Sequence, residues 1–228
     1  MAQAAGGAQA TLLNTQAATP SPSAPPATFD AVLQAGLDRG IPGVALRVER
    51  GGVGVFDGAA GLTSLEQQTP VAPGDRFGVG SITKTFTATL VLQLVDAGVL
   101  TLDDSVSQWL GNPVVARIPH VDEVTLHQLL NHTSGIYDVF DDDSPLWQDA
   151  YLGEGADWTR VWTSMEVLAY ADGAKHAPYF APGKGAHYSN TGYILLGLII
   201  EEATGQGYAE RLHARILDPL GLEDTFYA

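Results

Sequence analysis

A hydroxyl and an amine lie three residues apart in this chain, where a glycine-bearing turn over 77–80 meets an apolar stretch that ends near Leu94. They belong to Ser81 and Lys84. Residues three apart share one face of a helix, so the two side chains are predicted to lie one turn apart at a helix N-terminus. This places a nucleophile beside a base, next to unpaired backbone N–H groups that suit a developing oxyanion. Most Ser-x-x-Lys sequences arise by chance, and a lysine that extends into solvent from a surface turn is the structural alternative.

The elements before this pair favour a small mixed α/β region. Thr28 is placed to cap an amphipathic helix from Phe29 that stops at Gly40. Alternating apolar residues over 44–48 and an apolar run over 53–56 flank Gly51-Gly52, which predicts a β-hairpin rather than a phosphate loop. The stretch 58–76 is interpreted as turn-rich.

The elements from Ser81 onward are predicted to be mostly helical. The helix that follows Ser81 has almost no polar face, so it is expected to be buried on nearly all sides and to end at Gly98. Two short helices follow, one capped by Asp103 and one opened by a Thr125/Gln128 capping box. Further helices are expected over 191–203 and 208–217. The acidic residues at 138 and 141–143 lack the spacing of a calcium loop, so an exposed acidic loop is favoured.

Composition excludes several classes of function. The 228 residues carry a formal charge of −15 with only 11 Lys and Arg, which argues against nucleic-acid binding. There is no cysteine, and the six histidines lack the spacing of a zinc motif, so we expect no metal and no cofactor. No apolar run approaches the ~20 residues of a membrane-spanning helix. Residues 1–27, rich in Ala, Gln, Thr, Ser and Pro, are expected to be a disordered leader or linker.

Three landmarks occur in a fixed order: Ser-Ile-Thr-Lys at 81–84, His-Thr-Ser-Gly at 132–135 and Tyr-Ser-Asn at 188–190. Together with the flanking stretches 129–136 and 218–227, they resemble the penicillin-recognising serine enzymes, in the branch of D-alanyl-D-alanine carboxypeptidases and class C β-lactamases. The resemblance covers 28–228. It implies an α+β fold of the β-lactamase/transpeptidase type, an antiparallel sheet flanked by helices plus a helical domain. Residues 28–80 would form the first helix and hairpin, and 81–228 the mostly helical part.

The resemblance also implies roles for four residues. Ser81 would be the nucleophile, with Lys84 and Tyr188 sharing the task of base, and Asn190 would bind the substrate amide and Lys84. The structural alternatives are a packing role for Tyr188 and a helix cap for Asn190. His132 is expected to belong to a structural turn, because the chain has no Gly-x-Ser-x-Gly elbow.

The third element of the family, a Lys or His followed by Thr or Ser and Gly on a strand, has no counterpart downstream of Tyr188. We therefore expect the chain to be an N-terminal portion, an incomplete domain with the C-terminal strands missing and an open sheet edge.

The expected activity is that of a serine hydrolase that forms an acyl-enzyme on D-alanyl-D-alanine peptides of the cell wall. A β-lactamase, an esterase of small esters and a non-catalytic binder of cell-wall peptides or β-lactams are the alternatives. Substrates of this kind imply a periplasmic or secreted protein, and the sequence does not predict an oligomeric state.

Overall fold

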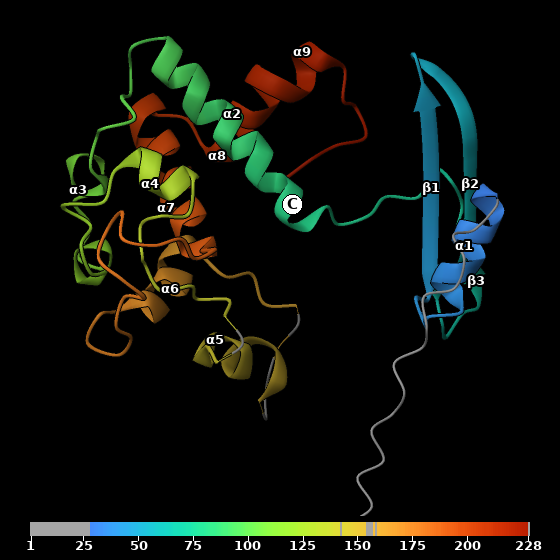
Figure 1. The fold of residues 1–228 in the computed structure, drawn as a ribbon, viewed down its shortest axis with the longest axis horizontal. Helices are drawn as coiled ribbons and strands as arrows, with labels where there is room; N and C mark the ends of the chain where they lie inside the picture. The colour runs from blue at the N-terminus through green and yellow to red at the C-terminus, as the bar shows by residue number, and fades with distance from the viewer. Residues whose placement is uncertain (1–27, 142, 154–156, 158, 228) are drawn as a thin grey trace, which may run out of the picture. The chain divides into compact units, whose positions relative to one another are not determined.

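The structure, a computed structural model, describes residues 28–141, 143–153, 157 and 159–227 (Figure 1). The predicted leader, residues 1–27, lies outside the described residues. The chain forms two compact units, one that ends at Phe77 and one that begins at Gly78. Each unit is described by itself.

The first unit contains one helix and a three-stranded antiparallel sheet in the order β1-β2-β3. Its elements are α1 (Phe29–Leu37), β1 (Gly43–Arg50), β2 (Val53–Ser64) and β3 (Thr69–Pro70). The predicted cap is confirmed, because Thr28 accepts a hydrogen bond from the N–H group of Ala31.

The predicted hairpin is also confirmed, since β1 and β2 pair across Gly51 and Gly52. Both glycines have positive φ, 59° and 78°, as the tight turn of a twisted hairpin requires. The turn-rich stretch expected over 58–76 is wrong for residues 58–64, because β2 continues to Ser64 and Gly61 pairs with Gly43. Glycine lowers strand propensity, but a Cβ on Gly61 would lie 2.3 Å from the Pro42 carbonyl oxygen, so this close pairing needs glycine. From Leu65 to Arg76 the chain does consist of turns and irregular structure around the short strand β3.

The second unit is helical in all its described elements (Figure 1). Its α-helices are α2 (Thr83–Asp96), α3 (Val106–Trp109), α4 (Leu126–Leu130), α5 (Pro145–Trp147), α6 (Ser164–Leu168), α7 (Asn190–Thr204), α8 (Tyr208–Leu212) and α9 (Asp218–Leu220). Short 3₁₀ turns are η1 (Gly80–Ile82), η2 (Val115–Arg117) and η4 (Ala169–Ala171), and π-helical turns are η3 (Gln148–Leu152) and η5 (His213–Leu217).

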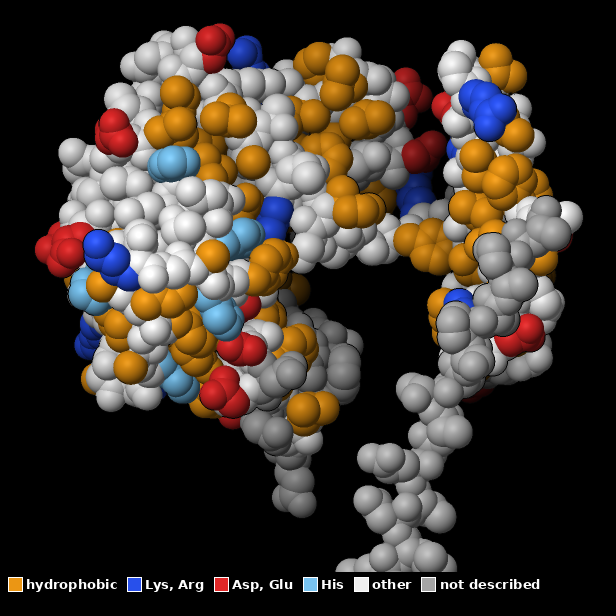
Figure 2. All heavy atoms as spheres, viewed as in Figure 1, with side chains coloured by type: hydrophobic (Ala, Val, Ile, Leu, Met, Phe, Trp, Pro, Cys, Tyr) orange, Lys and Arg blue, Asp and Glu red, His pale blue; other side chains and the backbone are white. Residues whose placement is uncertain are grey.

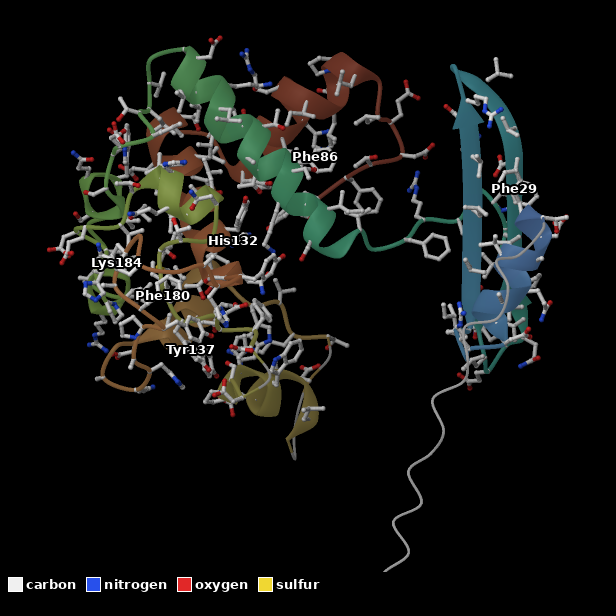
Figure 3. The ribbon with its side chains drawn as sticks, in the orientation of Figure 1. Phe29, Phe86, His132, Tyr137, Phe180 and Lys184 are labelled. Atoms are coloured by element: carbon white, nitrogen blue, oxygen red, sulfur yellow. The ribbon has the colours of Figure 1, made fainter. Side chains whose placement is uncertain are left out.

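The core of the second unit forms where α2 packs against α7 and α8. Leu195, Leu196, Ile199 and Ile200 of α7 are completely buried. Phe86 of α2 packs against this cluster (Figure 3).

The expectation that α2 is buried on nearly all sides is wrong. One face, with Leu90, Val91 and Leu94, is buried, whereas Leu92 is 51% exposed. The exposed face carries Thr85, Thr89 and Asp96 beside Leu92, so α2 has a polar face and is amphipathic.

The predicted helix ends agree with the structure in part. The Thr125/Gln128 capping box of α4 is confirmed, but α3 is capped by Ser105 and not by Asp103. The helix predicted over 191–203 is confirmed as α7, which ends at Gly205 with φ 65°. None of the described helices is both long and apolar enough to cross a membrane.

Candidate active site

Ser81 lies in the short turn η1, immediately before α2. The turn begins at Gly80, whose φ of 52° falls in the left-handed region that glycine adopts without strain. The predicted site residues Ser81, Lys84, Tyr188 and Asn190 all belong to the second unit, so their geometry is internal to one compact body.

The structure brings two proton-transfer groups to the Ser81 hydroxyl. The Tyr188 phenol donates a hydrogen bond to Ser81 Oγ at 2.7 Å, and Lys84 Nζ donates to the same oxygen at 3.3 Å. Tyr188 precedes α7 by two residues, and Lys84 is the second residue of α2. A serine hydroxyl in contact with two such groups has the arrangement of an activated nucleophile.

Lys84 is held in place by several contacts. Its Nζ donates a hydrogen bond to Asn190 Oδ1 at 2.5 Å and lies 4.8 Å from the Tyr188 ring centre and 5.4 Å from that of Tyr193. The ring faces attract the ammonium charge. The alternative of a lysine that extends into solvent therefore does not describe this side chain.

The environment of Tyr188 lowers the pKa of its phenol. Burial by itself would raise the pKa of the Tyr188 phenol, but hydrogen bonds with Lys84 and Ser81 and the charge of Lys84 outweigh burial and lower the pKa below its ordinary value. The side chain is 46% exposed, which leaves access for a ligand. Tyr188 is thus suited to accept a proton from Ser81.

His132 lies behind Tyr188 and supports it. Its ring centre is 4.4 Å from that of Tyr188, and its Nδ1 accepts a hydrogen bond from the N–H group of Ser189 at 3.2 Å. Burial, followed by the charge of Lys84, lowers the pKa of His132, although Asp138 acts in the opposite direction. These contacts fit the expected structural turn, in which His132 has a positive φ of 61°.

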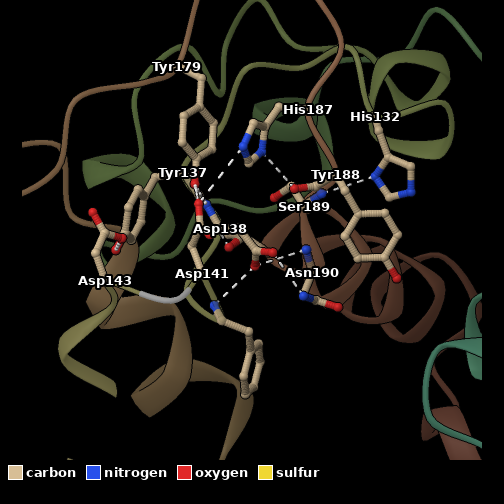
Figure 4. Close-up of polar contacts among 12 residues, drawn as sticks. His132, Tyr137, Asp138, Asp141, Asp143, Tyr179, His187, Tyr188, Ser189 and Asn190 are labelled. Carbon is tan, nitrogen blue, oxygen red and sulfur yellow. Dashed lines mark hydrogen bonds and ion pairs between the residues drawn. The ribbon is translucent and has the colours of Figure 1, made fainter. Parts of the chain in front are cut away.

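The cap of α7 is Ser189, whose hydroxyl accepts a hydrogen bond from the N–H group of Gly192. The alternative that Asn190 caps this helix is therefore wrong. The side chain of Asn190 instead bridges two residues. Its Oδ1 accepts a hydrogen bond from Lys84, and its Nδ2 donates one to Asp138 (Figure 4).

Asp138 was missed by the sequence analysis, which placed it in an exposed acidic loop. The structure corrects this interpretation, since Asp138 is only 5% exposed and accepts hydrogen bonds from Asn190 N at 3.0 Å and Asn190 Nδ2 at 2.9 Å. A usable signal was present, because Asp138 interrupts the otherwise apolar and aromatic run 136–140. A lone carboxylate in such a run indicates a buried, hydrogen-bonded group.

A cavity of about 430 Å³ opens beside Lys84 and Asn190, among α2, α7 and the start of α8. Its walls are mainly apolar and aromatic, with Phe140, Tyr193 and Leu198 among them. Within the described residues, no group of three or more His, Asp or Glu side chains is arranged to hold a metal ion. On the face of the second unit drawn in Figure 2, the described Lys and Arg side chains stand apart from one another among acidic and apolar ones.

Comparison with known proteins identifies the class to which this arrangement belongs. The family described as Beta-lactamase matches residues 29–228, so the chain is a member of that family. Its fold is accordingly of the β-lactamase/transpeptidase type, and its described part is helical with a small antiparallel sheet.

The relatives of this chain are named for different functions. Penicillin-binding protein 4 of Amycolatopsis lactamdurans is 37% identical over 81% of this chain and 44% of its own length, and esterase EstB of Burkholderia gladioli is 34% identical over 87% and 50%. A solved structure of a D-stereospecific amidohydrolase from Streptomyces sp. is 39% identical, with a TM-score of 0.71 over 83% of this chain and 53% of that one. The chain thus spans about half the length of these relatives or somewhat less.

Proposed function

We propose that this protein is a serine hydrolase that forms an acyl-enzyme on Ser81. The observation that carries the proposal is the approach of two proton-transfer groups to one hydroxyl, with Tyr188 Oη at 2.7 Å and Lys84 Nζ at 3.3 Å from Ser81 Oγ. Membership of the Beta-lactamase family supports the same chemistry.

The proposed reaction has two steps. Ser81 Oγ bonds to the substrate carbonyl carbon while its proton passes to the Tyr188 phenolate, and Lys84 stabilises the negative charge nearby. The bond to the amine or alkoxide then breaks, and this leaving group takes the proton from Tyr188. In the second step water attacks the acyl-enzyme, releases the acid and returns the proton to Ser81. Asn190 contributes by holding Lys84 and by hydrogen bonding to the substrate amide.

The proposed substrate is a peptide that ends in D-alanyl-D-alanine, as the resemblance to the carboxypeptidases implies. The relatives named as a penicillin-binding protein and as a D-stereospecific amidohydrolase support an acyl donor of this kind. The likeness to esterase EstB favours a small ester as the second candidate. A cell-wall substrate also leads us to propose a location outside the cytoplasm, which secretion of a tagged protein would test.

The test is covalent labelling of the folded protein with a fluorescent penicillin, followed by mass spectrometry of its peptides. We expect the adduct on the peptide that contains Ser81, and none in Ser81→Ala. Ser107→Ala, which removes an exposed serine from the same unit, is the matched control and should label like the parent protein. An unlabelled folded protein would overturn the proposal and favour a non-catalytic binder. A Ser81→Ala variant that still carries the adduct would also overturn it, because the nucleophile would then be another residue.

Turnover rates then distinguish between the candidate substrates. Initial rates are compared for a D-alanyl-D-alanine peptide, a cephalosporin and a p-nitrophenyl ester, each with Ser81→Ala as the blank. A peptide rate no greater than the blank, together with rapid ester hydrolysis, would replace the peptidase assignment with the esterase one.

A further inference from the structure

We infer that Asp138 is a positioning residue of this site, which orients the side-chain amide of Asn190 and through it holds Lys84 against Ser81. Its meaning for catalysis rests on the proposed function, whereas the arrangement itself is independent of any activity. Asp138 does not contact Ser81, so its effect passes through Asn190 and Lys84.

The contacts of Asp138 carry the inference. Its carboxylate is 5% exposed and accepts three hydrogen bonds, two at Oδ1 from the N–H groups of Asn190 (3.0 Å) and Phe140 (3.1 Å), and one at Oδ2 from Asn190 Nδ2 (2.9 Å). Figure 4 shows Asp138 between the main chain and the side chain of Asn190. One carboxylate therefore binds both the start of α7 and the amide that faces Lys84.

The polarity of these hydrogen bonds allows one orientation of Asn190. A carboxylate only accepts hydrogen bonds, so the NH₂ group of Asn190 must face Asp138. An ammonium group only donates them, so the amide oxygen must face Lys84. The amide is thus polarised between a negative and a positive group, which strengthens both bonds in a partly buried site.

The backbone around Asp138 is tied to the same helix turn. The N–H group of Val139 donates to Thr191 Oγ1 at 3.0 Å, and Thr191 Oγ1 donates to the carbonyl oxygen of Tyr137 at 2.7 Å. The N–H group of Asp138 itself donates to the Tyr179 phenol oxygen at 3.2 Å. Because these neighbours are fixed on both sides, the carboxylate has little freedom to follow a displaced Asn190.

Two simpler roles would leave Lys84 where it is. In the first role Asp138 only stabilises α7, because a negative charge near a helix N-terminus is favourable. In the second role it only contributes its negative charge to the electrostatic field around Tyr188. Besides the Ser81 hydroxyl, the titratable groups around Tyr188 are Lys84 on α2, His132 and Asp138 before α7, and Tyr193 on α7. Of these, Lys84 lowers the pKa of Tyr188 and Asp138 raises it.

The test is Asp138→Asn, which keeps the shape of the side chain but places an NH₂ group opposite the NH₂ group of Asn190. We expect Asn190 to turn its oxygen toward residue 138 and so to present a donor to Lys84, which then leaves Ser81. The pKa of Tyr188 should rise by about one unit, because a departing ammonium no longer stabilises the phenolate. A spectrophotometric tyrosine titration measures it, with Tyr188→Phe on each background used to isolate the signal.

The sign of that shift distinguishes the roles. If Asp138 acts only through its charge, its removal lowers the pKa of Tyr188, and if it only stabilises α7, the pKa of the folded variant is unchanged. Either result would overturn the inference. Asp143→Asn, an exposed carboxylate of the same segment, is the matched control. Asp143 accepts a hydrogen bond from the Tyr137 phenol and not from Tyr188, so this variant should leave the Tyr188 signal, isolated with Tyr188→Phe, unchanged.

Kinetics add a second readout if the penicillin labelling succeeds. Displacement of Lys84 should slow acylation by Asp138→Asn about 100-fold with little change in affinity for the initial complex. The exchange variant D138N/N190D restores complementary hydrogen bonds, with a donor at 138 and an acceptor toward Lys84, and should recover part of the lost rate. No recovery, together with an unshifted Tyr188 titration, would contradict positioning, whereas a failure of all labelling in the parent protein bears on the proposed function alone.

Discussion

The imidazole Nδ1 of His132 accepts a hydrogen bond from the backbone N–H group of Ser189 at 3.2 Å. An imidazole that accepts at Nδ1 is neutral and carries its proton at Nε2. The contact joins the turn before the segment 136–141 to the residue that caps α7, and it places the His132 ring against Tyr188.

This relationship predicts a pH-dependent stability. The pKa of His132 is lower in the folded protein than its ordinary value, so the unfolded chain takes up the proton first as pH falls. The free energy of unfolding should therefore decrease as pH drops below about 6.5 and stop decreasing below the folded-state pKa. His132→Asn removes this contribution and accepts the positive φ. Urea denaturation at several pH values between 5 and 8 measures how the unfolding free energy of the parent protein and of His132→Asn depends on pH. The same pH dependence in both proteins would contradict the prediction.

Loss of the Tyr188 hydroxyl should impair acylation far more than folding. Tyr188→Phe removes the group that lies 2.7 Å from Ser81 Oγ, and we expect acylation to slow by about 10²- to 10⁴-fold. Because the side chain is 46% exposed, the unfolding free energy should change by about 1 kcal/mol or less. Stopped-flow labelling with a fluorescent penicillin measures the rate. Tyr170→Phe, which removes a phenol bonded to Asp149, is the control, and equal rates for the two variants would refute the role of Tyr188.

Gly135, the glycine of the turn that follows His132, should be hard to replace. Its φ is 73°, and an added Cβ would lie 2.0 Å from the carbonyl oxygen of Phe180, so Gly135→Ala combines backbone strain with a clash. We expect a loss of more than about 2 kcal/mol in unfolding free energy. Gly98→Ala has nearly the same φ, 70°, but open space around the new Cβ, so strain alone should cost about 1 kcal/mol. Chemical denaturation compares the two, and equal losses would show that the clash is relieved.

The packing of α7 should dominate the stability of the second unit. Leu195 is completely buried, so Leu195→Ala should lower the unfolding free energy by about 2–5 kcal/mol. Leu92, on the exposed side of α2, provides the matched control, and Leu92→Ala should cost less than about 1 kcal/mol. Thermal unfolding followed by circular dichroism ranks the pair, and a larger effect at Leu92 would indicate that this face of α2 is covered in solution.

Features that depend on neighbouring residues could be predicted from the sequence. The caps at Thr28 and Thr125 and the turn at Gly51-Gly52 follow from hydrogen bonds or backbone angles within a few residues. The contact between Lys84 and Ser81 follows from helical spacing in the same way. The extension of β2 past Gly58 could not be predicted from neighbouring residues, because it depends on pairing with β1 across the hairpin.

Residue types and their order along the chain therefore determined which groups are available for chemistry, namely a serine, a lysine, a tyrosine and an asparagine in a recognisable sequence. Only the tertiary structure decided what connects them. It buried Asp138 beneath Asn190 and placed the Asn190 amide between Asp138 and Lys84. The physical reason is that burial and hydrogen-bond partners are set by segments far apart in sequence, and no local pattern records which donor meets a given carboxylate.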